Sequence, residues 1–353
     1  MSKFVCNALD SAVTFLPDGK IAPCCIIKND YSKNITELYN LDRFSDLKGI
    51  EPKAECQSCV AYNKYNRQFD KFTPNGNIKF IDFRNSNLCN LKCRTCGPRY
   101  SSAWARELGL ESTFVETNVD EYLSDVLTNN IEEIYFAGGE PMMNSDHWRL
   151  IESLIEMGLA PSISLQYSTN LTIIDYKDKN VFDLWKHFKK VTVLVSVDAT
   201  GTAFENIRSN ASWTTLDKNL TRLIENKNIS VSLAFTMSIL SIWFLKDVLS
   251  YALSKRIGVT VTNLTDPHYF TLNVMPDEFV KIGINLLNES IKLNPSLKHS
   301  LTQAINALQN NDDVFSFNQM ISSVLLADKI RSENLFDMLP FKDYATKLLF
   351  KNQ

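Results

Sequence analysis

Three cysteines lie close together in the sequence, at Cys89, Cys93 and Cys96, in the spacing C-x3-C-x2-C. Three thiolates on one short loop can hold three corners of a cubane iron-sulfur cluster, which leaves the fourth iron without a protein ligand. An iron with an open position can bind a small molecule and reduce it. The residues between the cysteines are mostly polar, which is unusual around cysteines that are buried for packing alone. The spacing therefore predicts a cluster with one reactive iron.

A single zinc ion is the alternative occupant of this loop. Zinc more naturally takes four ligands, from two C-x2-C pairs or from a set of cysteines and histidines. Between Phe4 and Trp148 the sequence contains one histidine, His147. The iron-sulfur cluster is therefore the favoured interpretation.

Six β-rich runs and the amphipathic stretches between them must position this loop. The expected strands are residues 78–84, 132–137, 163–169, 191–197, 230–236 and 258–262, and the expected helices are residues 99–109, 119–129, 145–157, 179–189, 214–225 and 242–254. Strands that alternate with helices are typical of parallel sheets and barrels, so we predict an α/β fold with a partial (β/α)6 TIM-type barrel. In such folds chemistry gathers at the carboxyl ends of the strands, and the cysteine loop follows the first of these.

The two ends of the chain differ from this alternating region. Residues 1–75 are rich in Asn, Lys, Pro and Cys, and Thr73-Pro74-Asn75-Gly76 is the expected boundary. We predict a small metal-binding module over residues 1–75, the partial barrel over residues 76–270 and a helical cap over residues 271–353. One apolar helix face in this cap consists of Leu297, Leu301, Ala304, Ile305 and Leu308.

Composition narrows the class of protein. The chain has 353 residues, 44% of them hydrophobic, and a formal net charge of -3. No basic surface for nucleic acid is indicated. The first residues lack a signal sequence and no apolar run is long enough to span a membrane, so we expect a cytoplasmic protein that binds neither membranes nor nucleic acid. All eight cysteines precede residue 97, which excludes a disulfide framework across the fold. The oligomeric state is left open.

A second motif, Gly138-Gly139-Glu140-Pro141, follows the second expected strand. Together with the cysteine loop it resembles the radical S-adenosylmethionine superfamily. The resemblance implies that the open iron of a [4Fe-4S] cluster binds the amino and carboxylate groups of S-adenosylmethionine. It also implies that an electron from the cluster splits this cofactor, and that the resulting 5′-deoxyadenosyl radical removes hydrogen from a substrate.

The glycines suit such a site because, without a Cβ, Gly138 and Gly139 let the backbone approach a ligand and tolerate positive φ. Glu140 can balance the amino group of that ligand. A plain connection from strand to helix, with Pro141 at the first helical position, is the alternative for this turn taken alone.

Further cofactor contacts are implied by the segments after later strands. Ser196, Asp198 and Arg208 resemble the family residues that approach the cofactor from the end of the fourth strand. Asp198 can accept hydrogen bonds from ribose hydroxyls, and Arg208 offers a planar fork for a carboxylate. A helix cap and an ordinary ion pair are the alternatives. Asn170, after the third strand, is a further candidate of the same kind.

The cysteines of the N-terminal region resemble an auxiliary-cluster domain called twitch, a shorter relative of the SPASM domain. The resemblance implies that Cys6, Cys24, Cys56 and Cys59 hold a second [4Fe-4S] cluster and that Cys25 is an extra thiol. A zinc knuckle is the alternative.

The sequence is compatible with three functions. The first is hydrogen abstraction from a peptide or protein side chain, leading to oxidation or crosslinking, because the resembling family includes many peptide-modifying enzymes. The second is dehydrogenation of a small alcohol or amine. The third is a metal-binding regulatory protein without catalysis. The resemblance also implies a flavodoxin or ferredoxin as the electron donor.

Overall fold

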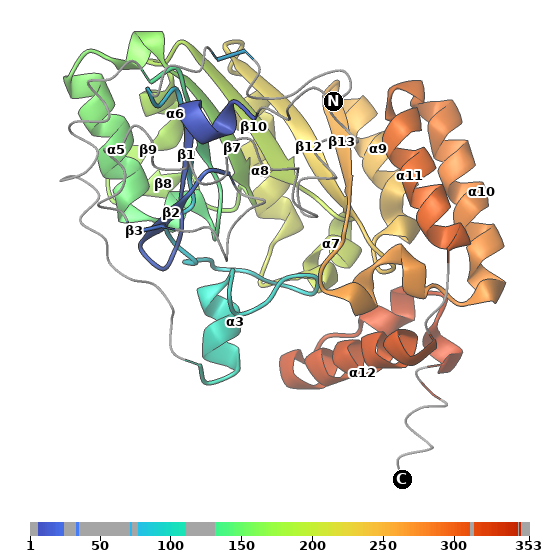
Figure 1. Ribbon diagram of the computed structural model, residues 1–353. Helices are drawn as coiled ribbons and strands as arrows, with labels where there is room; N and C mark the ends of the chain where they lie inside the picture. Colours follow the sequence, from blue (N-terminus) through green and yellow to red (C-terminus); the bar gives the residue numbers. More distant parts are fainter. Residues whose placement is uncertain are drawn as a thin grey trace, which may run out of the picture.

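A computed structural model of the chain describes residues 6–24, 33–34, 71–72, 77–110, 131–310, 314–344 and 346 (Figure 1). Six parallel strands form its centre and are neighbours in chain order. They are β4 (Phe80–Phe83), β6 (Glu133–Phe136), β7 (Ser164–Thr169), β10 (Lys190–Ser196), β12 (Ile229–Met237) and β13 (Gly258–Asn263). The strands coincide with the six expected from the sequence, which confirms the α/β class and its parallel sheet.

Each central strand presents one apolar face and one mixed face, as its alternating sequence requires. In β10, Val191, Val193 and Val195 are buried, whereas the residues between them are partly exposed. The register keeps these faces aligned, since Val193 lies between Tyr167 of β7 and Val231 of β12. The apolar side chains therefore form one continuous layer across the sheet.

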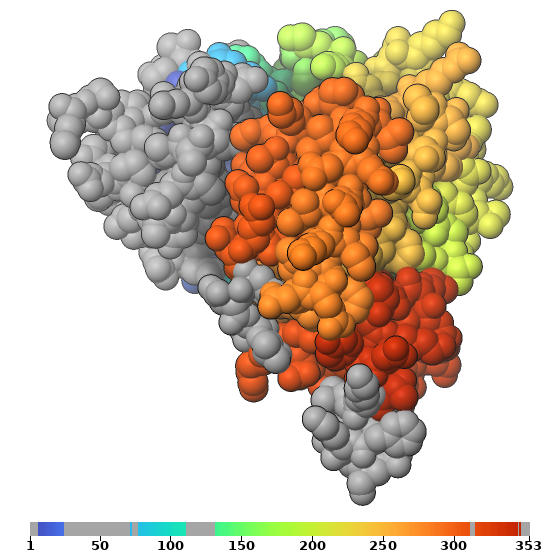
Figure 2. Space-filling view, turned by 90° about the vertical axis from the view of Figure 1, so that its right-hand side faces the viewer, coloured from blue at the N-terminus to red at the C-terminus, as the bar shows by residue number. Residues whose placement is uncertain are grey.

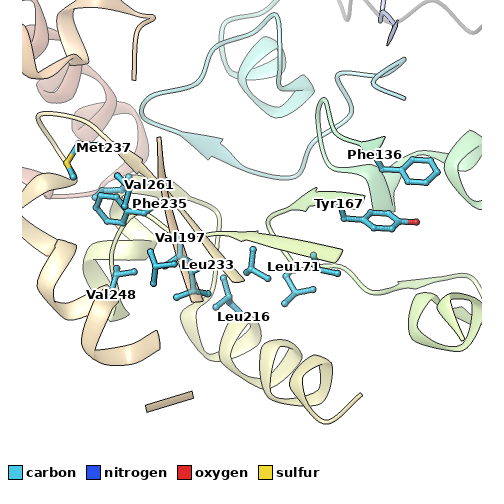
Figure 3. Packing of buried hydrophobic residues seen from close by; sticks show 14 of the residues in the cluster. Phe136, Tyr167, Leu171, Val197, Leu216, Leu233, Phe235, Met237, Val248 and Val261 are labelled. Carbon is cyan, nitrogen blue, oxygen red and sulfur yellow. The ribbon is translucent and has the colours of Figure 1, made fainter. Parts of the chain in front are cut away.

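Helices cover this apolar layer. They are α5 (Ser145–Glu156), α6 (Val181–Trp185), α8 (Trp213–Ile224) and α9 (Leu245–Lys255), which correspond to four of the expected helices. Figure 3 shows side chains of the sheet lying near Leu216 of α8 and Val248 of α9, within one buried cluster. Of the other two expected helices, the first is shorter, α3 (Ser102–Glu107), and the one at residues 119–129 lies outside the described residues.

The N-terminal segment continues the central sheet. After the short helix α1 (Ala8–Ser11), strand β1 (Ala12–Phe15) pairs in parallel with β4, from Ala12 opposite Phe80 to Phe15 opposite Phe83. Strands β2 (Lys20–Ala22) and β3 (Lys33–Asn34) follow in antiparallel order and extend the sheet to nine strands. The boundary expected at residues 73–76 lies outside the described residues, and the three-part division of the chain stays a prediction.

The C-terminal region is helical where the structure describes it. Helices α10 (Asp277–Leu293) and α11 (Lys298–Gln309) lie side by side next to β13 and α9, and α12 (Val314–Arg331) lies below them (Figures 1 and 2). Leu301, Ala304 and Leu308 are buried, as the apolar face of this region predicts.

Four two-residue strands and one short helix complete the elements near the ends of the sheet. They are β5 (Lys92–Cys93), β8 (Asp175–Tyr176), β9 (Lys179–Asn180), α7 (Gly201–Ile207) and β11 (Arg208–Ser209). Among the helices in the described part of the chain, none combines the length and the apolar character that a bilayer crossing requires.

Candidate functional site

The cysteine loop follows β4 and is hydrogen-bonded to a distant part of the chain. Its strand β5 pairs antiparallel with β11, so that Cys93 lies opposite Arg208 and Lys92 opposite Ser209. A further backbone bond, 2.8 Å long, joins Arg94 N to the carbonyl oxygen of Ile207. The fold thus brings together two segments that the sequence separately associated with a cofactor.

The three thiols of the loop lie close enough to influence one another. The pKa of Cys89 and of Cys96 is raised to about 12, chiefly by burial and next by the neighbouring Cys93. Burial also raises the pKa of Cys93, although the guanidinium of Arg208 opposes this shift. A bound metal must displace the thiol protons, and its charge would offset the cost of burying the thiolates.

The type and number of donors in this loop can be compared with what a cluster and a single metal ion require. Within the described residues, no three Cys, His, Asp or Glu side chains are gathered so that they could hold one ion. A cubane needs no such convergence, because each thiolate binds a different iron. Cys89, Cys93 and Cys96 supply the three thiolates that a [4Fe-4S] cluster takes from the protein, so this donor set fits such a cluster.

The glycine turn after β6 packs directly on the backbone that leads into the cysteine loop. Gly139 N donates to the carbonyl oxygen of Ser86 at 3.0 Å, and Glu140 N donates to that of Leu88 at 2.6 Å. A Cβ on Gly139 would lie 2.1 Å from the Leu88 carbonyl oxygen, and Gly138 has φ of +107°. Both positions thus require glycine even without a ligand. The close approach fixes the cysteine loop, a role of the glycines that was not predicted from the sequence.

Glu140 joins the ends of β6 and β7. Its side chain is buried and accepts hydrogen bonds from the hydroxyl of Thr169 at 2.7 Å and from the backbone N–H of Asn170 at 2.8 Å. It also caps the short 3-10 helix Pro141–Met143, which begins at Pro141 as the alternative interpretation of the turn expected. Burial raises the pKa of Glu140 and these hydrogen bonds lower it, and the net result is a pKa of about 7.

Asn170 contacts the cysteine loop from the end of β7. Its Nδ2 donates to Oδ1 of Asn90 at 3.0 Å, and its own Oδ1 accepts from the backbone N–H of Thr172 at 2.9 Å. Between them, Leu171 has φ of +54°. Asn90 lies between the first two cysteines and was missed in the sequence, where only its place in the loop marked it.

Asp198 and Arg208 form a buried ion pair beside the loop. Arg208 Nη2 lies 2.9 Å from Asp198 Oδ2, and Arg208 Nη1 lies 3.8 Å from the sulfur of Cys93. Asp198 Oδ1 also accepts from the backbone N–H of Thr236 at 3.1 Å. Arg208 Nε is buried without a hydrogen-bond partner among the described residues. Ser196, at the end of β10, is partly exposed and pairs in register with Ala234.

Only part of the predicted auxiliary site lies in the described chain. Cys6 precedes α1 and Cys24 follows β2, and both are partly buried. Cys25, Cys56 and Cys59 lie outside the described residues. The second cluster therefore stays a prediction.

Comparisons with known proteins agree with this geometry. The family model described as the radical SAM superfamily matches residues 86–241, a little under half of the chain. A curated relative, 7-carboxy-7-deazaguanine synthase of Thermoplasma acidophilum, is 24% identical over 102 residues, which cover 29% of this chain and 44% of the relative. The chain thus spans less than half the length of this relative.

Two solved structures are similar at low sequence identity. Streptococcus suis SuiB bound to S-adenosylmethionine has a TM-score of 0.44 and 15% identity, over 70% of this chain and 57% of SuiB. TYW1 with a lysine-pyruvate adduct has a TM-score of 0.38 and 12% identity, over 60% of this chain and 73% of TYW1.

The family match begins just before the cysteine loop and ends just after β12. It therefore includes the loop, the glycine turn, Asn170 and the Asp198–Arg208 pair. The fold assembles these groups beyond the carboxyl ends of the parallel strands. The segment of the chain that matches the radical SAM superfamily is therefore the segment whose residues form the candidate site.

Proposed function

We propose that Cys89, Cys93 and Cys96 hold a [4Fe-4S] cluster and that the enzyme cleaves S-adenosylmethionine reductively. When bound, the cluster and S-adenosylmethionine supply a 5′-deoxyadenosyl radical that removes hydrogen from a substrate. The observation that carries this proposal is the joint geometry of the cysteine loop, the glycine turn and Arg208, within the segment that the family model matches.

Some residues around the loop hold it in place, and others are positioned to contact the cofactor. The Gly138–Glu140 turn and Asn170 fix the loop through backbone and side-chain hydrogen bonds, so its cysteines are positioned before any metal arrives. Arg208 lies beside Cys93, and its buried Nε–H, which has no hydrogen-bond partner in the described part of the chain, suits a carboxylate ligand. Asp198 orients this guanidinium, and Ser196 and Pro141 complete the proposed cofactor contacts.

We propose that the substrate binds against the face of the sheet opposite the helices, which carries polar side chains. Here Asp82 of β4 is opposite Tyr135 of β6, and the Tyr135 hydroxyl lies 2.7 Å from that of Ser168. Arg84 binds both oxygens of Asp82 at 2.7 Å. Hydroxyl and charged groups of this kind suit a polar substrate rather than a lipid.

We propose a peptide or protein side chain as the substrate, modified by oxidation or crosslinking. Strand β13 ends the sheet, and among the described residues β12 is its strand partner. An edge of this kind can bind an extended peptide through main-chain hydrogen bonds. The resemblance to twitch proteins supports the same class, and dehydrogenation of a small alcohol or amine is the competing outcome.

The proposal is tested by anaerobic reconstitution of the full chain with iron and sulfide, followed by reduction with dithionite in the presence of S-adenosylmethionine. We expect about eight irons per chain if both clusters form and about four if only the loop is occupied, with release of 5′-deoxyadenosine. The variant in which Cys89, Cys93 and Cys96 are all Ala should release none, while iron at the proposed auxiliary site of Cys6, Cys24, Cys56 and Cys59 is retained.

Bound zinc and no 5′-deoxyadenosine from the unmodified chain would overturn the proposal and favour a regulatory protein. If cleavage occurs, the mass of the product from candidate peptides and from sugar alcohols separates the two substrate classes. Replacing dithionite by reduced flavodoxin or ferredoxin tests the proposed type of electron donor.

A further inference from the structure

The end of α12 and the residues that follow it, 328–333, contact the cysteine loop directly. The connection begins at Arg94, which lies between Cys93 and Cys96 and whose side chain is 1% exposed. Its Nη1 donates to the carbonyl oxygen of Val324 at 3.1 Å, and its Nη2 forms ion pairs with Asp328 and, at 2.6 Å, with Glu333. A loop residue is therefore anchored to the C-terminal region at three points.

A second arginine makes the reverse connection, from α12 to the loop. Arg331 Nη1 donates to the carbonyl oxygen of Lys92 at 2.9 Å and to Oγ of Ser209 at 3.0 Å. Its Nη2 lies 2.7 Å from Oε1 of Glu107 at the end of α3. One guanidinium thus binds both strands of the small β5–β11 sheet and α3 as well.

Trp104 of α3 links this arginine to a cysteine. The Arg331 guanidinium lies 4.3 Å from the centre of the Trp104 ring, and Trp104 Nε1 donates to the carbonyl oxygen of Cys93 at 2.9 Å. Cys93 is therefore one hydrogen bond and one ring contact away from Arg331. This arrangement fixes the backbone of a proposed cluster ligand.

The charges in this group balance. Three cations, Lys92, Arg94 and Arg331, face three anions, Glu107, Asp328 and Glu333. Glu333 also accepts from the hydroxyl of Ser209 at 2.7 Å. Buried charges of this kind are tolerated only when each has its partners, so removing one member leaves others unpaired. The group therefore behaves as a unit.

We infer that residues 328–333 are a C-terminal clasp that positions the cysteine loop for its cluster, with Arg331 as the central positioning residue. The inference rests on the proposed function for the identity of the bound group. The proposed role of Arg331 requires no contact with the cysteine sulfurs or with a reacting atom. Arg331 acts on Cys93 through Trp104 and the β5 backbone, so its loss should loosen the loop and make the cluster easier to remove.

The test compares variants of the full-length chain after anaerobic reconstitution. Arg331→Ala removes the central residue of the clasp, and Lys329→Ala is the matched control because Lys329 is exposed on the same helix end. Iron release to an excess of chelator is followed by absorbance at equal folded fraction, determined by circular dichroism. We expect release from Arg331→Ala about tenfold faster than from the unmodified chain, as for other residues that support metal ligands. Lys329→Ala should remain within about twofold.

A second readout needs no cluster. The rate at which iodoacetamide modifies Cys93 in the metal-free full-length chain, measured by mass spectrometry, should also rise about tenfold in Arg331→Ala. Arg331→Lys should recover only part of the loss, since an ammonium cannot reproduce the planar fork. If Arg331→Ala does not fold, Arg331→Lys and Glu333→Gln decide the question by the same two rates.

Equal rates for the Arg331 variants and Lys329→Ala, at equal folded fraction, would overturn the clasp. If the unmodified chain binds no iron but Cys93 still becomes more reactive in Arg331→Ala, the clasp stands and the proposed function falls.

Discussion

Two buried parts of this protein are stabilised in different ways. In the layer between sheet and helices, side chains such as Leu165, Val193 and Phe136 are completely buried and almost entirely apolar. At the rim, beyond the carboxyl ends of the strands, Arg94 and Asp198 are nearly as buried but carry charge. Apolar burial is non-directional, whereas buried charges require specific partners. The layer should therefore tolerate altered shapes, and the rim should not tolerate altered geometry.

The largest effect is expected at the glycine turn of the rim. In Gly139→Ala the new Cβ would lie 2.1 Å from the Leu88 carbonyl oxygen, a backbone atom that cannot move without shifting the cysteine loop. We expect a loss of more than about 4 kcal/mol in unfolding free energy, measured by urea denaturation. Gly258→Ala is the control, because its Cβ would lie at an ordinary 3.7 Å from Ser232 Cβ. Similar losses in both variants would contradict the role of the close approach.

The buried ion pair of the rim gives the next largest effect. Arg208→Ala leaves Asp198 buried without its cation and should lower the unfolding free energy by about 4 kcal/mol. The double variant Arg208→Met with Asp198→Asn removes both charges and should lose clearly less. A double variant as unstable as Arg208→Ala would show that the cost comes from packing rather than from an unpaired charge.

In the apolar layer, Leu165→Ala should cost about 3 kcal/mol by leaving a cavity in the centre of the sheet. Iron bound per folded chain should not change, since Leu165 lies near the start of β7 whereas the site lies beyond its carboxyl end. Thr192→Ala, on the opposite face of the adjacent strand, is the control and should cost less than about 1 kcal/mol. A loss of iron in Leu165→Ala would show that layer and rim are coupled.

Acid should weaken the layer through His147, which is buried against Phe136 and lies 2.9 Å from the Tyr167 hydroxyl. Burial lowers the pKa of His147 from 6.5 to about 3. Below pH 6.5, His147 therefore binds a proton in the unfolded chain but stays neutral in the folded chain. Stability from this site should fall by about 1.4 kcal/mol per pH unit as the pH drops from 6.5 towards 3. Urea titrations of the metal-free chain and of His147→Gln at several pH values measure this difference in slope, and equal slopes would contradict it.

Glu140 gives the rim the opposite pH dependence. Its pKa rises from 4.5 in the unfolded chain to about 7 in the folded chain, chiefly through burial. The folded chain therefore holds the extra proton between these values, and stability from this site should fall as the pH rises from 4.5 to 7. The slope should be about 1.4 kcal/mol per pH unit in this window and absent in Glu140→Gln. If stability instead fell as the pH dropped, the hydrogen bonds from Thr169 and Asn170 would outweigh burial in setting the pKa of Glu140.

The sequence supported the layer and the rim to different degrees. The alternation of buried and partly exposed residues in β10 is visible in the sequence, and it placed the strand within one or two residues of its observed bounds. The cysteine spacing likewise indicated the loop. By contrast, nothing near Arg94 in the sequence points to Asp328 or Glu333, because ion pairs between distant segments leave no local pattern.

By itself, the sequence determined the parallel strands, the close spacing of Cys89, Cys93 and Cys96, and the glycine turn, because periodicity and short-range spacing are local properties of the chain. Only the tertiary structure decided what these parts contact: that Gly139 closes on the Leu88 carbonyl, that Arg208 pairs with Asp198 beside Cys93, and that Arg331 reaches the loop from α12. Contacts of this kind depend on how separate elements pack, and packing is settled only when the whole sheet has assembled.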